Sequence, residues 1–346
     1  MQVTLTASDL DGYLRQEDRS AIESMGAKYA QVMHAFAADP ACPQSTQDVI
    51  AGFDAIGSLM QETLAAEPRV HVYSFETPES SHGEASRLIA KLRDVATLRP
   101  EYTYYVQRAY ELLFNLVAGR TYQKNKNYII VRTPVDLPLA NYAVHKIPNV
   151  DEFFARSVMC VMLRGALLPS MIMSKEIQEY STSGYVTPFA LFRIYRDDAK
   201  QEHTMEYTLD LDRSYFDLAA LDGKDLYFAD PMNATGGSLV TVVKYLLEQG
   251  VVPRSVKCLN IIAVLKGALR IVRAIENSEV YTIWMDPALN SKAYILPGLG
   301  DAGDRINGAD DDRHPRGIIQ LISDYGANTS ALYRSQVREI EKTVLT

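Results

Sequence analysis

The chain has 346 residues, of which 47% are hydrophobic and 23% are charged, and its formal net charge is −8. This composition is typical of one large folded domain with an appendage, and it excludes disordered, collagen-like and low-complexity chains. The acidic balance argues against a nucleic-acid-binding or membrane-binding surface, so we expect small-molecule substrates, no nucleic acid and no membrane.

The cysteine and histidine patterns argue against disulfides and against a metal held by the protein itself. Cys42, Cys160 and Cys258 are widely spaced, and the six histidines show no ligand spacing. Arg164 and Lys266 interrupt the long apolar runs, so no signal peptide or membrane span is predicted. We expect a cytoplasmic protein in a reducing compartment.

Residues 1–69 are predicted to form a helical N-terminal extension. Ser20–Glu23 has the pattern of a capping box, and apolar residues then follow the 3.6-residue helical period. After the break at 40–43, a second helical pattern runs to about Leu64. We interpret this segment as a helical hairpin appended to the main domain, and we expect a chain without it to fold.

Residues 70–309 alternate between short apolar or β-branched runs and helical patterns, which predicts an α/β domain with a mostly parallel sheet flanked by helices. The strand candidates are 71–75, 128–131, 157–163, 188–195, 225–229, 256–264 and 280–284. Residues 310–346 are predicted to be a C-terminal helical tail. It begins with an acidic run, Asp310–Asp312, that we interpret as a solvated turn. It ends in an amphipathic helix with Tyr333, Val337, Ile340 and Val344 on one face.

One segment combines a strand, a small-residue loop and a helix, which is the arrangement of a phosphate-binding site. The loop consists of Asp230, Pro231, Met232, Asn233, Ala234, Thr235, Gly236, Gly237 and Ser238. The N–H groups of 234–238 can surround a phosphate at the helix N-terminus, and Thr235 and Ser238 add hydroxyl donors. Asp230 is placed to hold sugar hydroxyls, and no Walker lysine is present. A plain glycine turn between strand and helix is the alternative.

A second segment, Tyr294–Arg305, contains a formal G-x-G-x-x-G pattern. We reject dinucleotide binding here, because we expect neither a helix directly after the glycines nor a later strand to complete the unit. The pattern favours an irregular loop whose backbone groups contact a planar, hydrogen-bonding ligand. The alternative is a plain connecting loop.

These two segments, in this order, resemble the uracil phosphoribosyltransferase family. ADPMNATGGS at 229–238 is similar to the family's phosphoribosyl-binding loop, and YILPGLGDAGDR at 294–305 is similar to its uracil-binding loop. The resemblance covers about residues 70–309. Weaker agreement is found in LRDVAT (92–97), RTP (132–134), MLRGAL (162–167), IYRDDAK (194–200) and MEY (205–207).

The resemblance implies a type I phosphoribosyltransferase fold that binds phosphoribosyl pyrophosphate (PRPP), with Mg²⁺ bound mainly through PRPP. It places Arg164 and Arg196 at the pyrophosphate, Asp230 at the ribose, and the 231–238 loop at the 5′-phosphate. Asp301 would face both the base and the PRPP. The remaining residues matched to base binding are Tyr294, Ile295, Gly300 and Ala302.

The resemblance therefore implies an enzyme that makes UMP and pyrophosphate from uracil and PRPP in pyrimidine salvage, as a homo-oligomer, either a dimer or a tetramer. Three departures keep two alternatives open. Gly165 stands one position from the family's glycine, Asn233 replaces a leucine, and Lys266 replaces a glutamate. The alternatives are a catalytically silent PRPP-binding or nucleotide-binding regulator, and a transferase for a different acceptor that Lys266 would help to select.

Overall fold

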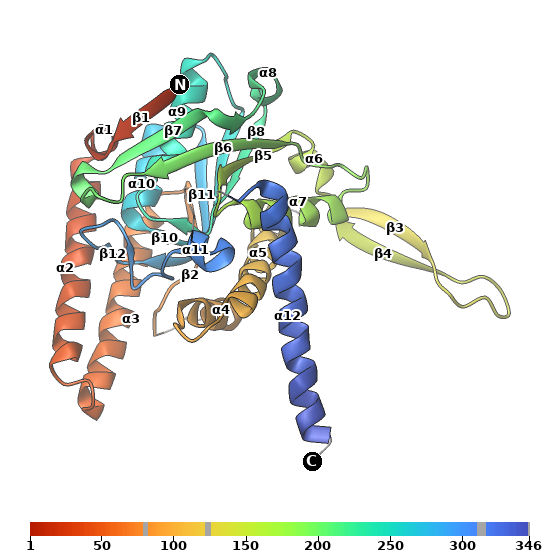
Figure 1. Ribbon diagram of the computed structural model, residues 1–346, viewed down its shortest axis with the longest axis horizontal. Coiled ribbons are helices and arrows are strands. Elements are labelled where there is room, and N and C mark those ends of the chain that lie inside the picture. Colours follow the sequence, from red (N-terminus) through yellow and green to blue (C-terminus); the bar gives the residue numbers. More distant parts are fainter. Residues whose placement is uncertain (79–81, 122–125, 310–315, 345–346) are drawn as a thin grey trace.

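The computed structural model describes residues 1–78, 82–121, 126–309 and 316–344. In these residues the main feature is a nine-stranded sheet with the order β1-β7-β6-β5-β8-β10-β11-β2, and β9 pairs with β10 (Figure 1). Its strands are β1 (Gln2–Thr6), β2 (Val70–Ser74), β5 (Ser157–Leu163), β6 (Phe189–Arg196), β7 (Glu206–Tyr215), β8 (Asp225–Ala229), β9 (Met232–Asn233), β10 (Ser255–Val264) and β11 (Ser278–Asp286).

The sheet is parallel from β6 to β2, whereas β7 pairs antiparallel with β6 and the edge strand β1 pairs antiparallel with β7. This confirms the predicted α/β class. The five residues of β8 are all buried, and so are nearly all of those in β5, as expected for strands covered on both faces. No strand was predicted from the sequence over 206–215, where β7 lies.

Helices cover both faces of the sheet. Helices α4 (Gly83–Arg93), α5 (Arg99–Thr121) and α7 (Leu167–Tyr180) pack on one face, and α9 (Gly237–Glu248) and α10 (Leu265–Ala274) pack on the other. The short helices α6 (Asp151–Phe154) and α8 (Leu218–Leu221) and a 3-10 turn (Glu202–Thr204) lie in the connections. In the described residues, no helix is long and apolar enough to cross a bilayer.

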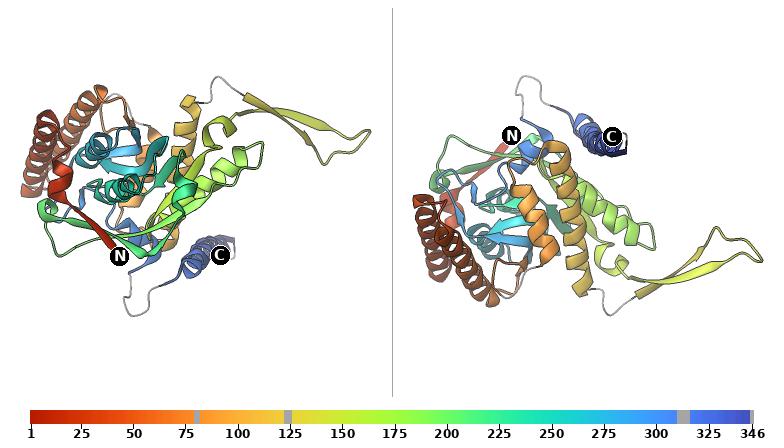
Figure 2. Two further views of the ribbon diagram at one scale, coloured as in Figure 1. Left: turned by 90° about the horizontal axis from the view of Figure 1, so that it is seen from above. Right: turned by 90° about the horizontal axis from the view of Figure 1, so that it is seen from below.

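Two elements project from this body. The strand predicted at 128–131 forms, but it belongs to a separate two-stranded arm of β3 (Lys126–Arg132) and β4 (Tyr142–Pro148). Figure 2 shows this arm extending away from the sheet, on the side opposite helices α2 (Gln16–Ala38) and α3 (Pro43–Ala65). Helix α12 (Ile318–Val344) packs on α5 and continues beyond it with an exposed apolar face.

The prediction for residues 1–69 is corrected in one respect. The hairpin of α2 and α3 is present, but the chain begins with β1, which pairs with the β7 edge from Gln2 opposite Asp210 to Thr6 opposite Glu206. Helix α1 (Ala7–Asp11) follows directly. An edge strand presents unpaired backbone groups, and β1 satisfies those of β7. The N-terminal segment is therefore part of the central sheet, although it lies outside the region of family resemblance.

The expectation of no helix after the second glycine-rich segment is also wrong. Helix α11 (Ala302–Asn307) begins directly after Asp301, whose carboxylate accepts the N–H of Asp304 at 2.9 Å. The other part of the expectation holds in the described residues, because only α12 comes after α11 and no strand completes a dinucleotide-binding unit. The acidic run Asp310–Asp312 lies outside the described residues, as does the side chain of Val344.

Candidate functional site

The predicted phosphate loop lies between β8 and the N-terminus of α9. Gly236 is the N-cap residue with φ = 71°, a left-handed conformation that favours glycine. A Cβ atom on Gly237 would lie 2.3 Å from the ring of Tyr207, so this position also requires glycine. The successive N–H groups at this helix start form a local concentration of positive dipole suited to an anion.

Thr235 is held in place by two donors. The Tyr207 hydroxyl donates to Thr235 Oγ1 at 2.6 Å, and the Gly237 N–H donates to the same oxygen at 3.4 Å. A hydroxyl has two acceptor lone pairs and one hydrogen, so the hydrogen of Thr235 remains to be donated to a ligand. Burial raises the pKa of Tyr207, which keeps it a neutral donor. The sequence showed Tyr207 only as part of the MEY agreement and gave it no role.

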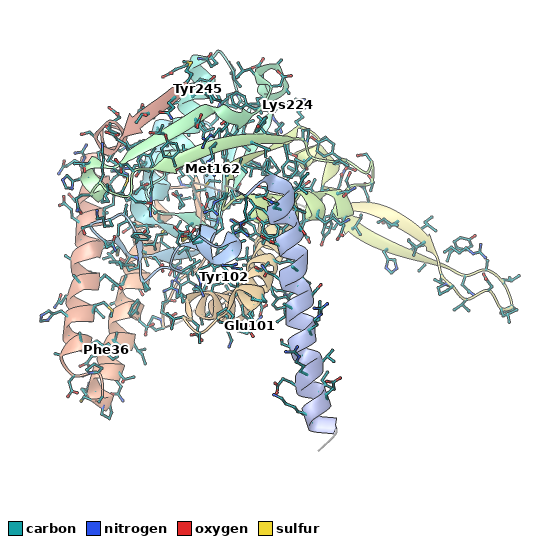
Figure 3. The ribbon with its side chains drawn as sticks, in the orientation of Figure 1. Phe36, Glu101, Tyr102, Met162, Lys224 and Tyr245 are labelled. Carbon is teal, nitrogen blue, oxygen red and sulfur yellow. The ribbon has the colours of Figure 1, made fainter. Side chains whose placement is uncertain are left out.

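Asp230 directly follows strand β8 and lines a cavity of about 130 Å³ together with Met162, Thr235 and Ser238. Met162 is labelled in Figure 3, near the centre of the molecule. Burial raises the pKa of Asp230 to about 6, the Met232 N–H opposes the shift, and the nearby charge of Asp301 adds to it. The carboxylate is therefore ionised at neutral pH but destabilised by its surroundings.

A larger polar cleft of about 860 Å³ adjoins this cavity, since Arg196 and Ser238 line both. Its walls also contain Arg164 and Asp301, so the structure brings the candidate pyrophosphate residues to one place. Residues that the sequence reasoning did not select also line it, namely Gln2, Arg193, Asp198, Asp210, Arg213 and Asp304. Asp198 and Asp304 lie within the segments 194–200 and 294–305 that resemble the family, but no role was assigned to them. The other four reach the cleft from β1, β6 and β7 without a motif around them.

The two candidate arginines are oriented by fixed partners. Arg164 donates to the Gly308 carbonyl at 3.0 Å and pairs with Asp304 at 3.2 Å. Arg196 pairs with Asp198 at 2.8 Å, and its guanidinium lies 4.7 Å from the centre of the Tyr294 ring. Both side chains are partly buried, which strengthens their interaction with an anion in the cleft.

The second glycine-rich segment is tied to the body of the protein by charged groups. Asp286, at the end of β11, accepts the Gly298 N–H at 3.0 Å and pairs with Arg93. Arg305 donates to the Leu299 carbonyl at 2.8 Å and to carbonyls of the α4–α5 connection, and it lies over the ring of Tyr102. The LRDVAT agreement thus marks the surface that holds this loop.

The candidate base-binding residues are only partly brought to the cleft. Asp301 lines it, and Tyr294 reaches it through its contact with Arg196. Ile295 belongs to the short ribbon of β12 (Ala288–Leu289) and β13 (Ile295–Leu296). Ile295, Gly300 and Ala302 are not among the residues that line either cavity.

Two of the three departures, Gly165 and Asn233, have no explanation in the described residues. A Cβ atom at Gly165 would meet the Cα of Gly303 at 3.4 Å, an ordinary contact, so the shifted glycine is not required there. Asn233 is 4% exposed, and a Cβ atom on Gly267 would lie 2.4 Å from its Oδ1. In the described residues, the amide of Asn233 has no hydrogen-bond partner.

Lys266 lines neither of these two cavities, but it lines a third one of about 290 Å³ together with Leu289 and Asn290. Its ammonium lies 2.9 Å from Glu202 and 3.6 Å from Asp11, and its side chain is 15% exposed. A simple exposed position therefore does not describe it. The positive charge of Lys266 thus lies beside two carboxylates, and one of them, Asp11, belongs to the N-terminal segment.

Comparison with known proteins identifies the family of this chain. The family model for uracil phosphoribosyltransferase matches residues 79–309. The uracil phosphoribosyltransferase of Bifidobacterium longum subsp. infantis is 32% identical over 206 residues, covering 58% of this chain and 86% of that protein. The uracil phosphoribosyltransferase of Mycoplasmoides gallisepticum is 29% identical over 229 residues, covering 66% of this chain and 96% of that protein. A solved structure of an Aquifex aeolicus protein covers 67% of this chain and 97% of its own, at 23% identity and a TM-score of 0.48.

Proposed function

Because this chain belongs to the uracil phosphoribosyltransferase family, we propose that it transfers the phosphoribosyl group of PRPP to a pyrimidine base, with uracil as the first candidate. The products would be UMP and pyrophosphate. The observation that carries the proposal is that the cavity at the phosphate loop adjoins the polar cleft that contains Arg164 and Arg196, with Arg196 and Ser238 lining both. One molecule with phosphates at both ends of a ribose would occupy both cavities.

The residues of this site match the charges that the reaction develops. A base nitrogen bonds to C1 of the ribose, the bond from C1 to pyrophosphate breaks, and the base loses its N–H proton. Positive charge grows on the sugar and negative charge on the leaving group. Arg164 and Arg196 would stabilise the leaving pyrophosphate, and Asp230 would accept hydrogen bonds from the ribose hydroxyls.

Mg²⁺ fits the donors present. Asp230 and Asp301 are carboxylates whose charges repel one another, which helps to raise the pKa of Asp230. Carboxylate and phosphate oxygens are the ligands that Mg²⁺ prefers. Asp301 and Asp230 would hold the ion together with the pyrophosphate of PRPP, where it would neutralise charge on the leaving group.

The test is incubation of the purified protein with PRPP, Mg²⁺ and a panel of pyrimidine and purine bases, with pyrophosphate release and product mass as readouts. UMP formation with uracil supports the proposal, and Arg196→Gln should abolish most of it. Binding of PRPP without product from any base would instead support a silent PRPP-binding regulator. Product from another base alone would support a different acceptor.

We also propose that the protein is a homo-oligomer, a dimer or tetramer, that associates through the β3–β4 arm. The arm exposes a group of large apolar side chains that a monomer would leave in water. These are Tyr128 (64% exposed), Ile130 (69%), Tyr142 (64%) and Val144 (61%). A second copy of the chain is the partner that the family resemblance favours.

A further inference from the structure

Arg270, on α10, is the largest fully buried side chain of the described residues. Its guanidinium contacts two separate parts of the protein. Nη2 and Nε donate to Asp11 Oδ1 at 2.6 and 3.1 Å, and Nη1 donates to the Thr235 carbonyl at 3.2 Å. Glu202 lies 3.7 Å from Nη2. A buried cation thus connects the N-terminal segment directly to the phosphate loop.

The bond to the Thr235 carbonyl has a geometric consequence for the loop. The peptide unit between Thr235 and Gly236 is planar and trans, so its C=O and N–H point in opposite directions. When Arg270 holds the carbonyl on its own side, the Gly236 N–H must point away from Arg270. Gly236 is the N-cap of α9, where N–H groups are directed at a bound anion.

Arg270 depends on Asp11 to keep this position. A guanidinium removed from water is costly unless a charge pairs with it, and Asp11 supplies the closest one. Asp11 is the last residue of α1, which packs near α10 because β1 joins the β7 edge. The N-terminal segment therefore supplies the counter-charge for a residue that orients the loop.

We propose that Asp11 and Arg270 are positioning residues for the 5′-phosphate, so that the N-terminal segment is part of the phosphate site. The proposal rests on the proposed function, since it assigns the 230–238 loop to the 5′-phosphate of PRPP. It also reverses our expectation that residues 1–69 are dispensable. The pair acts on one end of the substrate only, because neither residue lines the polar cleft that contains Arg164 and Arg196.

The experiment measures the affinity of the full chain for three probes by calorimetry. Ribose 5-phosphate reports on the phosphate loop, inorganic pyrophosphate reports on the arginine cleft, and PRPP reports on both. The variants are Asp11→Asn, which removes the counter-charge, and Arg270→Lys, which keeps the charge but loses the planar fork that reaches both partners. Arg270→Lys also serves if Asp11→Asn fails to fold.

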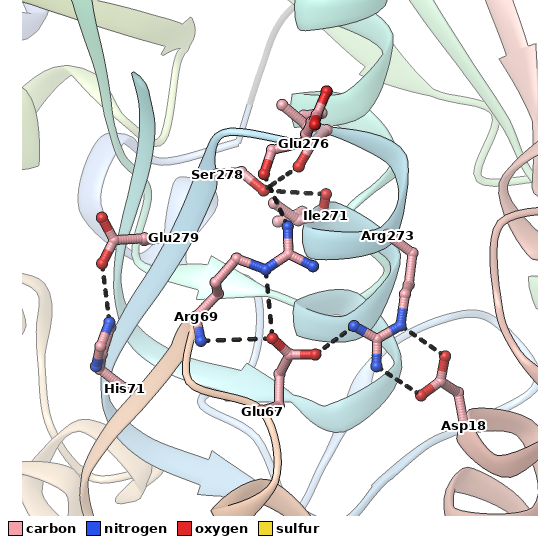
Figure 4. Close-up of polar contacts among 10 residues, drawn as sticks. Asp18, Glu67, Arg69, His71, Ile271, Arg273, Glu276, Ser278 and Glu279 are labelled. Carbon is pink, nitrogen blue, oxygen red and sulfur yellow. Dashed lines mark hydrogen bonds and ion pairs between the residues drawn. The ribbon is translucent and has the colours of Figure 1, made fainter. Parts of the chain in front are cut away.

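Asp18→Asn is the matched control. Asp18 also joins the N-terminal extension to α10, since both of its oxygens lie 3.0 Å from Arg273, which contacts Glu67 on its other side (Figure 4). Asp18 is more buried than Asp11, with side-chain exposures of 8% and 31%, so its loss should destabilise the fold at least as much. None of these bonds of Arg273 reaches the 230–238 loop.

We expect Asp11→Asn and Arg270→Lys to weaken ribose 5-phosphate and PRPP binding roughly tenfold, within the range of measured couplings through positioning side chains, and to leave pyrophosphate binding unchanged. Asp18→Asn should lower the melting temperature without changing any of the three affinities. Equal losses for all three probes, or losses in Asp18→Asn that match those in Asp11→Asn, would overturn the proposal. A wild-type protein that binds none of the probes would overturn the proposed function itself, and this inference with it.

Discussion

The Tyr207 hydroxyl donates a hydrogen bond of 2.6 Å to Thr235 Oγ1, across the boundary between strand β7 and the phosphate loop. This bond occupies one lone pair of Thr235 and directs the threonine hydrogen away from Tyr207. Tyr207 also packs so closely on Gly237 that no side chain fits there. A residue without a recognised role thus shapes the C-terminal end of the loop.

Tyr207→Phe should therefore weaken PRPP binding about fivefold, the loss expected for one neutral hydrogen bond worth about 1 kcal/mol. The matched control is Tyr185→Phe, because the Tyr185 hydroxyl donates at 2.7 Å to the Ser157 carbonyl, away from the loop. Calorimetry should show a weakened affinity for the first variant only. Equal affinities in both variants would show that Tyr207 does not act through Thr235.

Asp230→Asn should stabilise the fold at high pH while it reduces activity. The pKa of Asp230 is about 6 in the folded protein because of burial, but near 3.9 in an unfolded chain, so the folded state holds its proton more tightly. The carboxylate therefore costs stability increasingly as pH rises from about 4 to 6, and fully above pH 6.

Urea unfolding should show Asp230→Asn to be more stable than wild type by on the order of 2 kcal/mol at pH 8, with the gain disappearing near pH 4. Asp136→Asn, on the exposed arm, should show no change at either pH. A gain for Asp230→Asn that is the same at pH 4 and pH 8 would contradict the raised pKa.

Arg164→Gln and Arg196→Gln should each lower turnover about a hundredfold with little loss of stability, since their proposed partner is the charge that develops on the leaving group. Arg254→Gln is the opposite case. Arg254 pairs with the buried Asp225, outside both cavities, so its loss should lower the melting temperature and leave turnover per folded molecule unchanged. If activity and stability fall together in the first two variants, those arginines are structural.

Lys266→Glu should destabilise the protein by about 3 kcal/mol, because it places a third carboxylate beside Glu202 and Asp11. Lys266→Met, which removes the charge without adding another, should cost less and leave the choice of acceptor base unchanged. Denaturant unfolding and the base panel measure the two effects. A changed base preference in Lys266→Met would return this residue to the acceptor site.

Ile130→Asp should shift the protein toward the monomer, since it places a charge on the apolar face of the arm that a second copy would cover. The control is Ile340→Asp on the exposed face of α12, where Ile340 is 60% exposed. Light scattering coupled to gel filtration gives the mass of each variant. Dissociation by Ile340→Asp alone would place the interface on α12.

Features that depend on neighbours along the chain are predictable from the sequence. Apolar runs identified the buried parallel strands, and the 229–238 segment contains a strand end, a loop and a helix start within ten residues. Hydrogen bonds of a turn and a helix terminus are local, so a short motif is enough to specify them. Both glycine-rich loops could be matched to the family for the same reason, because each is one continuous stretch of sequence.

The distant groups that support those loops are known from the folded arrangement alone. Tyr207 reaches Thr235 from β7, Asp286 holds Gly298, and Asp11 reaches Arg270 over a separation of 259 residues. The strand β1 has the alternating sequence QVTLT, a pattern that is typical of a strand but does not specify β7 as its partner. Pairing between charges or strand edges far apart in sequence depends on the path of the whole chain. For that reason, Asp11, in an extension outside the family region, contacts Arg270 behind the 230–238 loop without any motif to mark it.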